Sequence, residues 1–312
     1  MALKANKTAL FILKIVVSSL LLYLVLSRTG VGNVLALLKS VNLFYFFVAV
    51  LFYILAQFLS TLRWRLLLPF TFKMRELFSL YMIGTFFNTL LPGIIGGDAV
   101  KGFYLYQATG RGGLSLASIF MDRYLGFSTL IGICVFAYPF GHQYFRGSNI
   151  EWILLLVVLV FLAGSFAVFG LQIGKKISIL SDFYEYSQTY LRQRKTIIKA
   201  LLLSLLVQLS VISGVFIISI GMGYHIPFIS YLLFLPLIIL FSSLPISVSG
   251  LGVREGAFVL FFGLIGIKAD VATAISLCWF VTVVTAGLIG FVEYLKYKKR
   301  KVISSHNQQK ED

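Results

Sequence analysis

Long apolar runs decide what this chain can fold into. A helix needs about 20 predominantly apolar residues to cross the roughly 30 Å hydrocarbon core of a bilayer. Runs of this kind lie at residues 8–27, 43–62, 114–138, 150–170, 197–220 and 270–292. Only 12% of the residues are charged, against about 25% in ordinary soluble domains. The sequence therefore predicts an all-α polytopic membrane protein with about six full spans, forming a single integral membrane domain over residues 1–312.

The charges of the chain are mostly basic, with a formal net charge of +16. Lys and Arg lie in short loops between the apolar runs, which is typical of membrane topology and not of nucleic-acid binding. The positive-inside rule places the N-terminus, the loop 63–75 that begins at Arg63, the loop 171–199 and the basic tail 296–312 in the cytoplasm. We therefore expect a multi-pass protein of the inner (cytoplasmic) membrane with both termini cytoplasmic.

Two further regions, 76–108 and 228–267, are apolar but are interrupted by Pro, Gly and charged residues. Such breaks are tolerated in lipid only where protein or a water-filled cavity satisfies the freed backbone groups. The cytoplasmic placement of the basic loops requires each region to cross the membrane an even number of times, the first from the inside and the second from the outside. We expect two broken or re-entrant helical hairpins in inverted orientation.

The interrupted regions carry similar motifs. Motif 88–103, in a first half of about residues 1–138, contains Leu-Pro, then glycines, a charged pair, Gly and Phe. Motif 244–258, in a second half of about residues 150–295, has the same order. Interrupted segments at corresponding places in two inverted halves are typical of a transporter's binding site near the membrane midplane. The alternative is chance, because Gly and Pro are common in membrane helices.

The motifs also suggest a ligand. A Gly-rich turn before a helix exposes amide donors, and the helix dipole there attracts anions. The planar guanidinium of Arg254 matches a pair of phosphate oxygens, and Lys101 supplies a point charge in the first motif. We predict no catalytic residue, metal or cofactor. The predicted site binds a lipid headgroup through Asn88, Gly96, Gly97, Asp98, Lys101, Asp122, Arg123, Gly250, Gly252, Arg254 and Glu255.

Spacing along the chain predicts how these charges pair. Asp98 lies three residues before Lys101, so the two side chains share a helix face and can neutralise each other. Arg254 and Glu255 are adjacent and are expected to point apart, which leaves Glu255 to find another partner. Arg123 is the available cation.

Asp122 and Arg123 lie inside the apolar run 114–138. A charge at the bilayer centre costs roughly 2.5–3.5 kcal/mol on insertion scales, so neither side chain is expected to face lipid. The alternative to a ligand site is a buried ion-pair network that only holds the helices together. Gln57 and Gln208 also lie within spans, and we expect them to form interhelical hydrogen bonds.

Three strings of residues together resemble the transmembrane-domain family of lysylphosphatidylglycerol synthases, which includes many stand-alone flippase-like membrane proteins. The resemblance covers nearly the whole chain. Lys101 stands where the family more often has Arg, which keeps the charge but removes the bidentate fork. The strings are Asn88-Thr89-Leu90-Leu91-Pro92 with Gly96-Gly97-Asp98 and Lys101, then Asp122-Arg123 with Gly126, and Leu244-Pro245 through Gly250-Leu251-Gly252-Val253-Arg254-Glu255-Gly256.

The resemblance implies two related parts around a lipid-sized cavity and transfer of lipid between leaflets. The soluble aminoacyl-transferase domain of the fused synthases is not recognised in this sequence, nor is any nucleotide-binding motif, so we expect no synthase activity and lean against an enzyme. We expect flippase-like translocation of a phospholipid or lipid-linked headgroup, with membrane lipids as partners. In this hypothesis the halves alternate in access, Arg254 and Lys101 hold phosphate, and Asp98 and Glu255 exchange ion pairs.

Two other functions stay open at this point. The first is a membrane-embedded transferase acting on a lipid-linked sugar, with Asp98 or Asp122 as the base. The outer loop 28–42 contains no acidic residue, which speaks against it. The second is an accessory subunit of a separate glycosyl- or aminoacyl-transferase. Association into a homo-oligomer is compatible with each of these functions.

Overall fold

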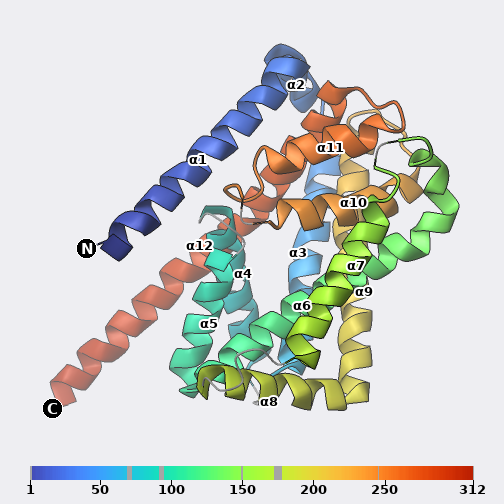
Figure 1. The fold of residues 1–312 in the computed structure, drawn as a ribbon. Helices are drawn as coiled ribbons and strands as arrows, with labels where there is room; N and C mark the ends of the chain where they lie inside the picture. Colours follow the sequence, from blue (N-terminus) through green and yellow to red (C-terminus); the bar gives the residue numbers. More distant parts are fainter. Residues whose placement is uncertain are drawn as a thin grey trace.

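The computed structural model describes residues 2–68, 72–90, 95–148, 150–171, 178–244 and 246–311. The described part is helical and contains no strand, as predicted (Figure 1). A short 3₁₀ turn, η1 (His142–Tyr144), and a π-helical turn, η2 (Phe166–Gly170), follow α6 and α7. The helices are α1 (Ala2–Thr29), α2 (Val31–Lys39), α3 (Leu43–Leu66), α4 (Met74–Leu90), α5 (Ile95–Thr109), α6 (Gly112–Gly141), α7 (Ile153–Ser165), α8 (Ser178–Arg192), α9 (Arg194–Gly221), α10 (Phe228–Ser242), α11 (Val253–Gly263) and α12 (Ala269–Glu311).

The long helices confirm a multi-pass membrane protein. Five segments are long and apolar enough to cross a membrane. The predicted first span becomes a sixth candidate, in which α1 and α2 meet at an angle of 86°. Gly30 forms this bend with a φ of 79°, a value that favours glycine. The five segments are Leu43–Leu66, Gly112–Tyr144, Ile153–Gly170, Arg194–Gly221 and Ala269–Lys296.

Each interrupted region forms a pair of short helices, as predicted. The first region gives α4 and α5, which pack against each other, and the second gives α10 and α11, which do the same. Leu91, Pro92 and Pro245 of the two motifs lie outside the described residues. The inverted orientation of the pairs relative to the two membrane faces stays a prediction.

Small residues let the helices of this bundle approach closely. A Cβ atom at Gly97 of α5 would overlap the carbonyl group of Gly84 on α4. A Cβ atom at Gly290 of α12 would likewise overlap the carbonyl group of Met82 on α4. Close backbone approach is how membrane helices gain packing contacts, since lipid provides no hydrophobic drive between them. The α4–α5 pair is therefore fixed against α12.

An aromatic cluster fixes the other pair. The Tyr231 ring of α10 lies 5.1 Å from the Phe262 ring of α11, and the Tyr231 hydroxyl donates a 2.6 Å hydrogen bond to Ser219 Oγ of α9. Both aromatic side chains are fully buried. The α10–α11 pair is therefore attached to the long helix α9 through a polar and an apolar contact.

The two helix pairs meet where the turn before α11 contacts the end of α4. Ser249, in the turn before α11, donates hydrogen bonds to the carbonyl oxygens of Asn88 (2.9 Å) and Thr89 (3.1 Å) at the end of α4. Its φ is 51°, and it alone among the described non-glycine residues has a positive φ. This region of φ is sterically unfavourable for a residue with a Cβ atom. The contact brings the two sequence motifs together.

Candidate functional site

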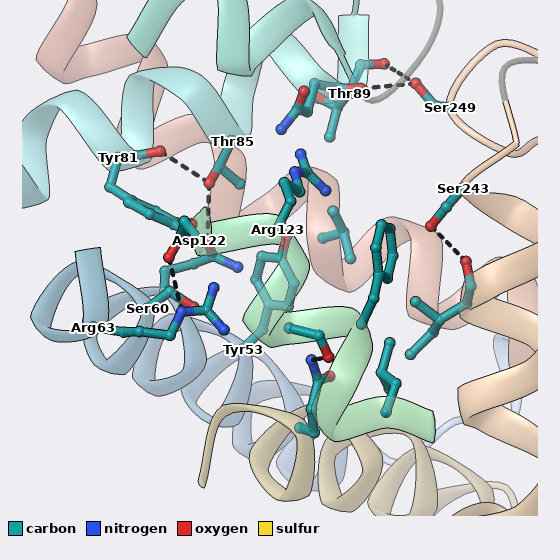
Figure 2. A pocket seen from close by; sticks show the side chains of 18 of the residues that line it. Tyr53, Ser60, Arg63, Tyr81, Thr85, Thr89, Asp122, Arg123, Ser243 and Ser249 are labelled. Atoms are coloured by element: carbon teal, nitrogen blue, oxygen red, sulfur yellow. Dashed lines mark hydrogen bonds and ion pairs between the residues drawn. The ribbon is translucent and has the colours of Figure 1, made fainter. Parts of the chain in front are cut away.

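A cavity of about 270 Å³ lies between the two helix pairs and the long helices α3, α6, α9 and α12 (Figure 2). Figure 2 shows the Arg123 side chain near its middle, with Arg63 and Asp122 to one side and Ser243 and Ser249 to the other. The volume is close to the lower end of the range for small-molecule sites, roughly 300–1,000 Å³. The cavity is therefore large enough for a small polar group.

One wall of the cavity is a polar stripe on α3. Tyr53, Gln57, Ser60 and Arg63 all line the cavity and follow one another at intervals of three or four residues, so they share one face of the helix. With a rise of 1.5 Å per residue, the stripe is about 15 Å long, or about half of a hydrocarbon core. Its spacing was visible in the sequence, but none of these four residues was among the predicted ligand contacts.

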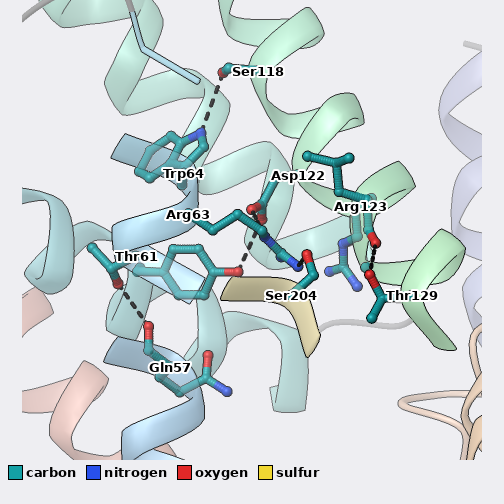
Figure 3. A network of polar contacts seen from close by, with 12 residues as sticks. Gln57, Thr61, Arg63, Trp64, Ser118, Asp122, Arg123, Thr129 and Ser204 are labelled. Atoms are coloured by element: carbon teal, nitrogen blue, oxygen red, sulfur yellow. Dashed lines mark hydrogen bonds and ion pairs between the residues drawn. The ribbon is translucent and has the colours of Figure 1, made fainter. Parts of the chain in front are cut away.

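Arg63 and Asp122 form a buried ion pair that the sequence did not predict. Arg63 Nε lies 2.7 Å from Asp122 Oδ1, and Arg63 Nη1 donates a 2.7 Å bond to Ser204 Oγ of α9 (Figure 3). The Tyr81 hydroxyl donates to Asp122 Oδ2 at 3.0 Å. The two charged side chains are only 5% and 2% exposed. The charges thus face protein, as expected for Asp122.

The prediction that Arg63 lies in a loop was wrong, whereas its placement on the cytoplasmic side stays a prediction. The helix α3 continues through Leu66, one turn beyond the predicted end of the span. A span predicted from a run of apolar residues ends at the first charged residue, because an isolated charge is costly in lipid. Here the carboxylate of Asp122, which is supplied by another helix, offsets that cost.

Asp98 is the centre of a second group of charges. Its Oδ1 lies 2.8 Å from Lys101 Nζ, which confirms the predicted pair, and its Oδ2 accepts a 2.5 Å bond from Arg123 Nε. Lys101 Nζ also lies 4.2 Å from the centre of the Tyr81 ring, a cation–π distance. The Arg123 side chain is 33% exposed, more than any other charged side chain in these ion pairs of the cavity.

Arg254 and Glu255 contact each other, so the prediction that they point apart was wrong. Arg254 Nη2 lies 2.6 Å from Glu255 Oε1, and Ser276 Oγ of α12 donates to the same oxygen at 2.9 Å. Glu255 Oε2 accepts a 2.6 Å bond from the Gly252 amide at the start of α11. A Glu in the first turn folds back to the helix N-terminus, and the long Arg side chain can reach it there. Arg123, the predicted partner, binds Asp98 instead.

The described charges at the cavity do not cancel. Four cations face three carboxylates, so the group carries one excess positive charge. Electrostatic interactions are stronger in a poorly solvated interior than in water. A single negative charge entering the cavity would balance the group. The cations are Arg63, Lys101, Arg123 and Arg254, and the carboxylates are Asp98, Asp122 and Glu255.

The predicted site residues fall into three groups. Five of them line the cavity, namely Asn88, Lys101, Asp122, Arg123 and Arg254. Asp98 and Glu255 act on it through their ion pairs with the lining cations. The four glycines, Gly96, Gly97, Gly250 and Gly252, are not among the lining residues.

Two of the glycine amides that were expected to face a ligand already have a protein partner. The Gly97 amide donates a 2.9 Å bond to Asn88 Oδ1, and the Gly252 amide binds Glu255. Gly250 and Gly252 have φ values of 75° and 81°, which shows that they are needed to shape the turn before α11. The glycines therefore position the charged residues.

Gln57 and Gln208 form the predicted interhelical hydrogen bonds. Gln57 Oε1 accepts a 3.0 Å bond from Thr85 Oγ1 of α4, and Gln208 Nε2 donates a 3.3 Å bond to the Gly126 carbonyl of α6. Both side chains also line the cavity. Their amide groups thus connect helices and at the same time add polar surface to the site.

Comparisons with known proteins connect the chain to a family of membrane proteins. The model of a family described as lysylphosphatidylglycerol synthase TM region matches residues 11–290. A UPF0104 membrane protein of Methanocaldococcus jannaschii is 21% identical to the chain, over 96% of this chain and 97% of that protein. No solved structure matches the chain.

Proposed function

The chain belongs to the lysylphosphatidylglycerol synthase transmembrane-region family, and we propose that it moves an anionic lipid headgroup between the leaflets of the cytoplasmic membrane. One observation carries this proposal, which is the polar cavity with an excess positive charge inside an apolar helical bundle. A phosphodiester headgroup has one negative charge, which would balance that excess. The termini are proposed to be cytoplasmic.

Exchange of partners gives the proposed site a mechanism. Without a lipid, each of the four described cavity cations has a carboxylate partner, so none of these four buried charges lacks a counter-ion. An entering phosphate competes with Asp98 for Arg123 and with Glu255 for Arg254. The guanidinium group of Arg presents paired donors that match two phosphate oxygens. Binding therefore replaces one ion pair with another of similar geometry.

The turn contact supplies the proposed moving part. Ser249 joins the end of α4 to the turn before α11 through its two hydrogen bonds. Neutral hydrogen bonds contribute only about 0.5–1.5 kcal/mol each, so this contact can open without loss of the bundle. If the turn before α11 separates from the end of α4, the cavity opens towards one leaflet. Alternation with an opening towards the other leaflet would give a headgroup access from each leaflet in turn.

A transport assay tests the proposal. The protein is reconstituted in vesicles containing fluorescent phosphatidylglycerol, and dithionite quenching measures the lipid that reaches the outer leaflet. The variant Arg254→Ala/Glu255→Gln removes the buried pair without leaving a lone charge. Charge-assisted hydrogen bonds contribute about 1.5–3 kcal/mol, so lipid transfer should slow by roughly 10- to 100-fold.

A matched control is available on the surface of α12. Glu293 and Lys296 form an ion pair at 3.0 Å in which Lys296 is 57% exposed. Glu293→Gln/Lys296→Ala removes the same two charges outside the cavity and should transfer lipid at the wild-type rate. Equal rates for the cavity variant and this control would disprove the assignment of the cavity as the transfer site.

A further inference from the structure

A second, apolar cavity of about 160 Å³ lies beside the polar one. We call it the annex. Its walls come from α9, α10, α11 and α12, and they include Val211, Val215, Phe258 and Trp279. Among the described residues that line the annex, Arg254 is the only charged one. The annex therefore suits a hydrocarbon segment and not a second polar group.

The annex and the polar cavity share part of their lining. Ile239, Ser243, Ser249 and Arg254 border both spaces. In Figure 2, Ser243 and Ser249 lie on the opposite side of the polar cavity from Arg63, so the annex adjoins that side. The change from polar to apolar surroundings occurs at Arg254. A ligand with a polar headgroup and an apolar chain requires a polar space that continues into an apolar one.

Arg254 is suited to stand at this boundary. Its guanidinium carbon lies 5.0 Å from the centre of the Phe280 ring, and its polar atoms contact Glu255 and Ser276. Arg side chains place their apolar stem along hydrocarbon while the charged end reaches polar groups. A phosphate at Arg254 would have its headgroup on the polar side and its first acyl carbons on the annex side.

The size of the annex limits what it can hold. An apolar cavity of about 150 Å³ in another protein stays dry and binds benzene. By that comparison the annex holds a segment of about six carbons. Since the annex continues from the polar cavity, the hydrocarbon that enters it is the part of an acyl chain that follows the glycerol ester.

We propose that the annex binds the first carbons of one acyl chain while the phosphate lies at Arg254 and the headgroup occupies the polar cavity. This inference rests on the proposed function, because it requires a lipid in the cavity. It names the substrate class as a two-part amphiphile with a small phosphodiester headgroup. A polar cavity of about 270 Å³ accommodates a small headgroup of this kind.

Photocrosslinking tests the position of the chain. Two forms of phosphatidylglycerol carry a diazirine, one at acyl carbon 5 and one at the terminal carbon, and each is reconstituted with the protein in phosphatidylcholine vesicles. Irradiation followed by peptide mass spectrometry locates the adducts. The carbon-5 probe should react with α9 and α12 near Val211 and Trp279, whereas the terminal probe should react at exposed apolar residues such as Leu206.

A pair of variants on the same helix provides the control. Val211→Phe fills the annex, and overfilling a packed space should lower the annex adducts of the carbon-5 probe by about tenfold. Leu206→Phe adds the same ring at an exposed position of α9 and should leave these adducts unchanged. If the carbon-5 probe labels only exposed positions, and Val211→Phe has no effect, the annex does not hold the chain.

A third probe separates this failure from failure of the proposed function. It carries the diazirine on the headgroup, and it should label the polar cavity near Thr89 and Gln57. Headgroup adducts in the cavity without acyl adducts in the annex would overturn the annex inference alone. Absence of both kinds of adduct would overturn lipid binding in the cavity as well.

Discussion

Replacing Asp122 with Ala should destabilise the protein by about 3–5 kcal/mol, because it breaks a buried ion pair and leaves one charge without its partner. Arg63 would keep neutral partners such as the hydroxyl of Ser204 but would lose its carboxylate, in surroundings where the side chain is 5% exposed. The Tyr81 hydroxyl would lose its acceptor as well. The loss should therefore fall in the upper part of that range.

The double variant Arg63→Met/Asp122→Leu should behave differently, because it removes both charges and keeps most of the volume. Only the neutral partners, Ser204 and Tyr81, then lose a hydrogen bond. At about 1 kcal/mol for each such bond, the double variant should lie within about 2 kcal/mol of the wild type. It should be more stable than Asp122→Ala.

Reversible unfolding in mixed micelles of dodecyl sulfate, followed by tryptophan fluorescence, measures these free energies. The exposed pair Glu293–Lys296 gives the comparison, since removal of a surface ion pair should change stability by less than about 1 kcal/mol. Equal losses for Asp122→Ala and the double variant would refute the reasoning, because the two charges would then not be coupled.

The same double variant decides between the two interpretations of this pair. If Arg63 and Asp122 only hold α3 against α6, the double variant should transfer lipid at nearly the wild-type rate. If they contact the headgroup, transfer should slow although the protein is stable. Lipid transfer and unfolding should therefore be measured on the same preparation.

Two further changes test the packing and the turn contact. Gly97→Ala should destabilise the protein by about 1–3 kcal/mol because its Cβ overlaps the Gly84 carbonyl. Gly256→Ala has open space around the new Cβ and should be neutral or stabilising by up to about 1 kcal/mol. Unfolding in mixed micelles compares the two variants, and equal losses of stability would contradict the packing argument. Joining Thr89→Cys to Ser249→Cys with a short cleavable thiol cross-linker should stop lipid transfer until the linker is cleaved. Transfer by the cross-linked protein would show that the turns need not separate.

Local spacing made part of this site predictable. The interruptions in two apolar regions located both helix pairs, because Gly and Pro disturb a helix wherever they stand. The pairing of Asp98 with Lys101 followed from an interval of three residues on one helix. In both cases the relevant partners lie within one short segment of sequence.

The remaining contacts depend on how distant segments fold together. Arg63 lies 59 positions from Asp122, and only the packing of α3 against α6 makes a charge acceptable there. Arg123 pairs with Asp98 and not with Glu255 for the same reason, because the packing of α5 places Asp98 within reach of Arg123. The periodic polar stripe from Tyr53 to Arg63 could have been recognised in the sequence. It was missed because a search for apolar runs does not register polar residues that are spaced one helical turn apart.

The ion pairs of α6 also bear on how the chain enters the membrane during synthesis. Asp122 and Arg123 each disfavour insertion of this helix by itself. Their partners, Arg63 in α3 and Asp98 in α5, both come earlier in the chain. Since translation proceeds from the N-terminus, both partners have left the ribosome before α6 emerges. The order of helices along the gene product thus allows each charge of α6 to be neutralised as it reaches the bilayer.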